Sequence, residues 1–92
     1  MNHLQTISDQ IYKFSLGNTY HAKEFCIALQ KQALQAFEIQ WSSREELESY
    51  IFSDHDVLAI TCSEDECNFD YLQARDLQHS VVNIISDFYD LE

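Results

Sequence analysis

Residues 57–71 read VLAITCSEDECNFDY, and this stretch decides the predicted fold class. Its first part, residues 57–62, is a continuous apolar run of strand length, which is typical of a buried strand. In residues 67–71 apolar and polar side chains alternate, which is typical of a half-exposed strand. We therefore expect the two strands to pair as an antiparallel hairpin, with the acidic residues 63–66 as its turn.

Apolar residues at helical spacing surround this hairpin. The first set predicts a helix over residues 4–15, and Gly17 with Asn18 supplies its stop and a turn. The second set predicts an amphipathic helix over residues 20–37, and the third predicts a final helix over residues 75–90. The inward-facing residues are Leu4, Ile7, Ile11 and Phe14 in the first helix; Ala22, Phe25, Cys26, Leu29, Ala33, Ala36 and Phe37 in the second; and Leu77, Val81, Ile84, Ile85 and Phe88 in the last.

Between the second helix and the hairpin, two further elements are predicted. Residues 38–41 alternate and predict a short strand. Ser42 and Ser43 each precede a glutamate by three residues, a capping-box spacing that predicts a helix over residues 43–52. The expected order is α-α-β-α-β-β-α. It describes one α+β domain over residues 1–92, with helices packed on a small antiparallel sheet.

The charge of the chain is concentrated in its second half. Residues 1–44 contain three acidic and four basic residues, whereas residues 45–92 contain thirteen acidic residues and one basic residue, Arg75. The formal net charge of the whole chain is −11. Direct binding to nucleic acid is disfavoured because phosphates would be repelled. A basic protein, or the DNA-binding surface of a protein, would be attracted.

No apolar run approaches the ~18 residues of a membrane span, and the first residues lack the basic start and apolar stretch of a signal peptide. We therefore expect a cytoplasmic protein that does not act on membranes. The three cysteines are then expected to stay reduced.

The cysteines and histidines do not form a pattern that predicts a metal site or a catalytic centre. Cys62 and Cys67 have C-x4-C spacing with no second pair, and His55 between two aspartates adds one further candidate ligand. A single glycine leaves little room for an oxyanion turn, and Cys26 falls on the apolar stripe of the second helix. We expect no enzyme activity and no cofactor.

Some acidic residues lie where a negative charge stabilises a helix, and others lie where it does not. Glu45 and Glu46 suit the first turn of a helix, and Asp76 would do the same for the last helix. Others are clustered or lie where a helix ends, with no base near them in sequence. We therefore predict a functional acidic surface, although solubility alone would also account for part of it. Its candidate residues are Glu45, Glu46, Glu48, Asp54, Asp56, Glu64, Asp65, Glu66, Asp70, Asp76, Asp87, Asp90 and Glu92.

Carboxylates on a folded protein can substitute for the phosphates of DNA. Helical neighbours lie about 5–6 Å apart, on the scale of the phosphate spacing along one strand. A basic DNA-binding groove would then accept the protein in place of DNA. The alternative is an acidic adaptor or immunity-type protein that binds one basic partner through aromatic anchors such as Trp41, Tyr50 or Tyr71.

The whole chain resembles the anti-restriction nuclease (Arn) proteins of T-even-type phages. The likeness covers its length, the opening MNHLQTISDQIYKFSLGN and the acidic stretch REELESYIFSDHDVLAITCSEDECNFDYLQARD. The resemblance implies a non-enzymatic, homodimeric protein of the host bacterial cytoplasm that mimics double-stranded DNA. It also implies two host partners, the modified-cytosine restriction system McrBC and the histone-like protein H-NS.

Overall fold

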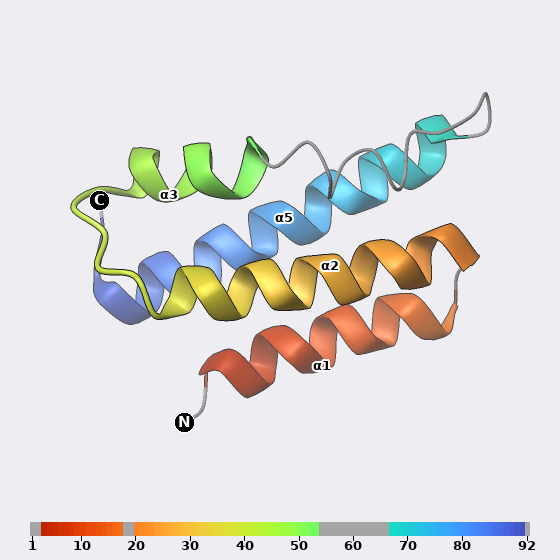
Figure 1. Ribbon diagram of the computed structural model, residues 1–92, viewed down its shortest axis with the longest axis horizontal. Helices are drawn as coiled ribbons and strands as arrows, with labels where there is room; N and C mark the ends of the chain where they lie inside the picture. The colour runs from red at the N-terminus through yellow and green to blue at the C-terminus, as the bar shows by residue number, and fades with distance from the viewer. Residues whose placement is uncertain (1–2, 18–19, 54–66, 92) are drawn as a thin grey trace.

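The computed structural model describes residues 3–17, 20–53 and 67–91, and the side chains of these except 20–22 and 67–71. Four α-helices make up this part of the chain: α1 (His3–Leu16), α2 (Tyr20–Phe37), α3 (Arg44–Phe52) and α5 (Cys67–Tyr89). Helices α1 and α2 form an antiparallel hairpin, and α5 runs along it in the direction of α2 (Figure 1). The short α3 lies beside α5 and also contacts α2, and α5 contacts all three other helices.

The core lies where the four helices meet, and the apolar stripes predicted from the sequence face it. Its fully or almost fully buried residues are Ile7 and Ile11 from α1; Phe25, Cys26, Leu29, Ala33 and Ala36 from α2; Leu47 and Ile51 from α3; and Ala74, Val81, Val82 and Ile85 from α5. The predicted helices over 4–15, 20–37 and 43–52 are confirmed to within one or two residues.

The predicted α+β fold class is wrong. The residues that the structure describes contain four helices and no strand, so this part of the chain is all-α. Two of the three predicted strands, over residues 38–41 and 67–71, fall wholly on residues whose backbone is described, and both are contradicted there. The third, over residues 57–62, and the predicted turn at 63–66 lie outside the described residues.

The predicted strand at residues 38–41 is a turn and loop. Backbone N–H groups of Glu38 and Ile39 donate to the carbonyls of Gln35 and Ala36, which tightens the end of α2 instead of extending the chain. The indole Nε1 of Trp41 then donates to the Ala36 carbonyl at 2.9 Å and folds the loop back on the helix. Alternation over four residues is too short to outweigh these local hydrogen bonds.

The predicted strand at residues 67–71 is the beginning of α5, which therefore starts eight residues before the predicted helix at 75–90. The physical reason is a helical stripe that continues through this stretch. Positions 67, 71, 74, 78, 81 and 85 recur at alternating intervals of four and three, and the last four of these are buried. Three acidic residues precede Cys67 in sequence and Asp70 follows it, a placement that favours the start of a helix.

Helix α3 has nine residues, too few to be stable alone, and polar side chains fasten it to its neighbours. The buried Gln32 of α2 donates from Nε2 to the Ile51 carbonyl at 3.3 Å. Gln78 of α5, also buried, donates to the same carbonyl at 3.2 Å. These bonds satisfy a carbonyl in the last turn of α3, where the helix itself provides no partner.

Helix α5 ends in a Schellman motif with Asp90 in the left-handed region, at φ 55°. Leu91 N–H donates to the Ser86 carbonyl at 2.9 Å, and Asp90 N–H donates to that of Asp87 at 3.4 Å. Glycine adopts this conformation at the lowest cost, and a carboxylate at a helix C-terminus is unfavourable. The position therefore carries a residue that its backbone does not favour.

We expect Asp90→Gly to raise the free energy of unfolding by about 0.5–1 kcal/mol, because it removes both the backbone strain and the unfavourable charge. The greater entropy of glycine in the unfolded chain opposes this gain and limits its size. Urea denaturation followed by circular dichroism measures the change. Asp90→Ala is the control, since it removes the charge but keeps the Cβ strain. Equal stability of the alanine and glycine variants would contradict a role for the left-handed backbone.

Candidate functional site

The structure places part of the predicted acidic surface. Five of the thirteen candidate carboxylates are exposed on α3 and α5 or just after α5, and Glu48 is half-buried. The exposed ones are Glu45, Glu46, Asp76, Asp87 and Asp90. Asp70 belongs to the first turn of α5, so its predicted place on a strand is wrong. The remaining candidates, Asp54, Asp56, Glu64, Asp65, Glu66 and Glu92, lie outside the described residues.

Glu45 and Glu46 lie in the first turn of α3, as predicted. The N-cap is Ser43, whose hydroxyl accepts from the Glu46 N–H at 3.2 Å. The Glu46 carboxylate in turn accepts from the backbone N–H of Ser42 at 3.2 Å and from the Ser42 hydroxyl. The Ser42 hydroxyl and then its N–H hold the pKa of Glu46 below its usual value. Glu46 is therefore a charged and exposed residue whose carboxylate also stabilises the start of α3.

Glu48 also has a structural role. Arg44 Nε lies 3.0 Å from its Oε1, one helical turn away on α3. A terminal nitrogen of the Arg44 guanidinium donates to the Asn83 side chain on α5. Arg44 therefore links α3 to α5 and partly neutralises Glu48, which makes Glu48 a weaker candidate for contact with a partner.

The last three described carboxylates lie along α5 and at its end. Asp76 was predicted to begin the last helix, but it lies in the middle of α5, so its predicted stabilising role at a helix start is wrong. Asp87 and Asp90 lie at the C-terminal end, as predicted, and the last turn of α5 contains no basic residue. Their charges are therefore unfavourable for the helix and available to a cationic partner.

A shallow hollow of about 380 Å³ lies at the start of α3. It is lined by Trp41, Ser43, Glu45, Glu46 and Ser49. The Trp41 ring packs against the Tyr50 ring with 5.1 Å between their centroids. The Trp41 indole N–H donates to the Ala36 carbonyl and is therefore not available to a partner. Two of the aromatic residues predicted as possible anchors, Trp41 and Tyr50, thus hold the loop before α3 in place. The side chain of the third, Tyr71, is not described.

The described residues give no support to thiol or metal chemistry. Cys26 is buried among the core residues of α2, and burial raises the pKa of its thiol to about 11, so that it is protonated at neutral pH. Within the described ranges, no three His, Cys, Asp or Glu side chains come together as a metal site. Cys62 and His55 lie outside them, and the side chain of Cys67 is not described.

An apolar face on the α1–α2 hairpin was not predicted. Tyr12 and Leu16 on α1 and Ile27 and Leu34 on α2 are exposed, Ile27 by 67%. They line two adjoining hollows of about 370 and 330 Å³, which share Ile27 and Gln30. Lys31 also lines the first of these hollows and Lys23 the second. The signal in the sequence was the position of Ile27 and Leu34, which are apolar but fall outside the buried stripe of α2.

No described helix is both long and apolar enough to cross a membrane. Among protein-family models, curated proteins and solved structures, no match to this chain is found.

Proposed function

We propose that this protein is a DNA-mimic inhibitor, which presents carboxylates to the DNA-binding surfaces of basic proteins. The observation that carries the proposal is the uneven charge, with thirteen acidic residues and one basic residue in positions 45–92. A surface of one sign attracts basic partners and speeds their association. By resemblance, the targets are H-NS and McrBC in the host bacterial cytoplasm, and inhibition requires binding alone.

The shape and rigidity of the molecule support this proposal. Its longest dimension is 37 Å, close to one turn of a DNA duplex, about 34–36 Å. Glu45, Asp76 and Asp87 project from packed helices and not from loops, so little order has to be gained when a partner binds. A rigid array of charges resembles the duplex backbone more closely than a flexible acidic tail does.

The proposal is tested by competition. The protein is titrated into a complex of duplex DNA with H-NS, at low and at physiological ionic strength, and released DNA is followed by fluorescence anisotropy. We expect displacement of DNA that weakens as salt increases, because salt screens the charges. Poly-L-glutamate at equal carboxylate concentration is the control for charge without structure. Failure to displace DNA even at low salt would refute the proposal, as would equal displacement by poly-L-glutamate.

We further propose that the protein is a homodimer joined through the α1–α2 face. Two copies with a charge of −11 repel each other, and the first 44 residues are the half without excess acid. The exposed Tyr12, Leu16, Ile27 and Leu34 would be covered by the second copy. Such an arrangement leaves α3 and α5 of both copies free and lengthens the charged surface.

Ile27→Glu is therefore expected to make the protein monomeric, because it places a charge in the centre of the proposed contact. Leu72→Glu is the matched control, since Leu72 is exposed by 64% on α5 and does not line the hollows of this face. Sedimentation equilibrium measures the mass of each variant. A wild-type monomer, or a dimer that persists in the Ile27→Glu variant, would contradict the proposal.

A further inference from the structure

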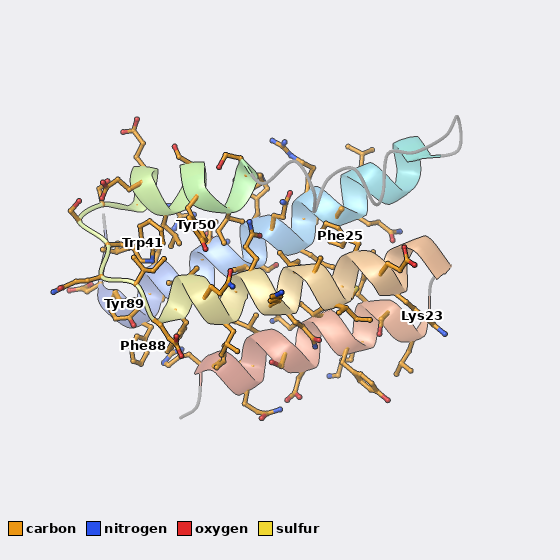
Figure 2. All side chains as sticks on the ribbon, in the orientation of Figure 1. Lys23, Phe25, Trp41, Tyr50, Phe88 and Tyr89 are labelled. Atoms are coloured by element: carbon orange, nitrogen blue, oxygen red, sulfur yellow. The ribbon has the colours of Figure 1, made fainter. Side chains whose placement is uncertain are left out.

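Aromatic side chains cluster where α2 and α5 end and α1 begins. The Phe88 ring centroid lies 4.8 Å from that of Phe37, 4.8 Å from that of Tyr89 and 5.0 Å from that of His3. Phe88 is nevertheless 46% exposed and Tyr89 37% exposed. Figure 2 shows both at the end of the bundle opposite Lys23. The four residues His3, Phe37, Phe88 and Tyr89 are called the aromatic end below.

The aromatic end is held in a fixed arrangement. The Tyr89 hydroxyl donates to the Phe37 carbonyl, which joins the last turn of α5 to the last turn of α2. Phe37 contacts both exposed rings, with 5.7 Å between its centroid and that of Tyr89. Rings fixed in this way present apolar area without losing side-chain freedom when a partner binds.

Two of the three helix ends at the aromatic end favour a cation, and they outnumber the N-terminus of α1, which carries partial positive charge. Helices α2 and α5 both direct their C-termini there, and neither has a basic residue in its last turn. The C-terminus of a helix carries partial negative charge, and the face of an aromatic ring is also negative. Exposed carboxylates of Glu38, Asp87 and Asp90 flank these two helix ends in sequence.

The five basic residues of the chain are engaged or placed elsewhere. Lys23 and Lys31 line the hollows of the α1–α2 face, and Lys13 lies in the last turn of α1. Arg44 bonds Glu48 and Asn83. Arg75 lies over the Phe52 ring at 4.7 Å from its centroid, so this chain already places a guanidinium on a phenylalanine.

We propose that the aromatic end is the anchor point for an arginine side chain of the basic partner, a step that rests on the proposed function. The guanidinium would stack on the exposed Phe88 ring, beside the Tyr89 ring that stands at 86° to it, and donate to the flanking carboxylates. A planar guanidinium is suited to both contacts at once, since its face stacks on a ring while its N–H groups at the edge donate to a carboxylate. The ammonium group of lysine is a point charge and has no flat face to stack. Arginine and aromatic residues are also the commonest anchors of protein interfaces.

The probe is the peptide acetyl-Gly-Arg-Gly-Arg-Gly-amide, and its analogue with citrulline in place of arginine is the uncharged control. Each is titrated into the full chain while backbone amide signals are followed by NMR. We expect the arginine peptide to shift the signals of Ile39, Phe88 and Tyr89 more than those of the exposed acids on α3. Shifts that are equal over all acidic segments, or equal with the citrulline peptide, would overturn the proposal.

Phe88→Leu keeps an apolar side chain but removes the ring, so we expect the peptide to bind about two- to five-fold more weakly. Leu72→Ala is the control on the same helix and should leave binding unchanged. Unchanged binding in the Phe88→Leu variant would overturn the proposal, as would an equal loss in Leu72→Ala. The peptide titration contains no DNA, so its failure would refute the arginine site at the aromatic end alone. Failure of DNA displacement would instead refute the proposed function, because that assay tests the acidic surface as a whole.

Discussion

Replacing Phe25 with alanine is expected to lower the free energy of unfolding by about 3–5 kcal/mol, the range measured when buried aromatic side chains are truncated. Phe25 is fully buried and is among the largest side chains of the core. Its helix, α2, contacts α1, α3 and α5, so the cavity would weaken several helix contacts together. A domain of this size has a total stability of about 5–15 kcal/mol, and the loss is therefore a large share of it.

Urea denaturation followed by circular dichroism measures this loss. Leu72→Ala is the control, because Leu72 is also a large apolar residue on a helix but is exposed by 64% on α5, outside the proposed dimer contact. We expect it to change the stability by about 0.5 kcal/mol or less. Equal losses in the two variants would contradict the assignment of the core to the inner faces of α1, α2, α3 and α5.

The helices that were predicted well share two features, long apolar stripes and clear ends. Helix α2 has five buried apolar residues at helical spacing, which no alternation of period two could reproduce. Ser43 marks the start of α3 because its hydroxyl and the Glu46 N–H form the expected capping bond. Local sequence was sufficient here because the competing conformations offered fewer hydrogen bonds or less burial.

The failure at residues 67–71 has a specific cause. Alternation over five residues fits a strand, but Cys67 and Tyr71 are also four apart and continue the stripe of Ala74 and Gln78. The stripe was hidden because Gln78 is polar, although it is fully buried and donates to the Ile51 carbonyl. A buried glutamine whose partner lies on another helix cannot be recognised from local sequence.

The residues of the candidate acidic surface could be predicted from the sequence, but their contacts and relative positions in the fold could not. The sequence identifies which residues are acidic, and the exposed positions of Glu45, Asp76 and Asp87 agree with a surface role. The capping-box spacing predicts a serine partner for Glu46, but the bond from Ser42 in place of the N-cap Ser43 was not predicted. The sequence also does not show that Arg44, the partner of Glu48, bonds Asn83 on α5. The exposed rings of the aromatic end also depend on tertiary packing, which brings three helix ends together.

The double charge reversal Glu45→Lys with Asp76→Lys is expected to weaken displacement of DNA from H-NS by about ten- to several-hundred-fold. Both carboxylates are exposed, on α3 and α5, and neither has a hydrogen bond from its side chain among those found in the described residues. An exposed ion pair contributes roughly 0.2–1 kcal/mol, and reversal replaces each attraction with a repulsion. The same competition assay, repeated over a range of salt, measures the effect.

The matched control is Asp9→Lys with Glu24→Lys, which changes the net charge equally but lies on α1 and α2. If the acidic surface of α3 and α5 meets the partner, this control should displace DNA nearly as well as the wild type. Equal loss in the two variants would mean that net charge alone acts, and the proposed substitution for phosphates would be wrong. Thermal unfolding of each variant establishes that a loss of displacement is not a loss of fold, which matters most for Glu24→Lys, because Glu24 is only half-exposed whereas the other three positions are exposed.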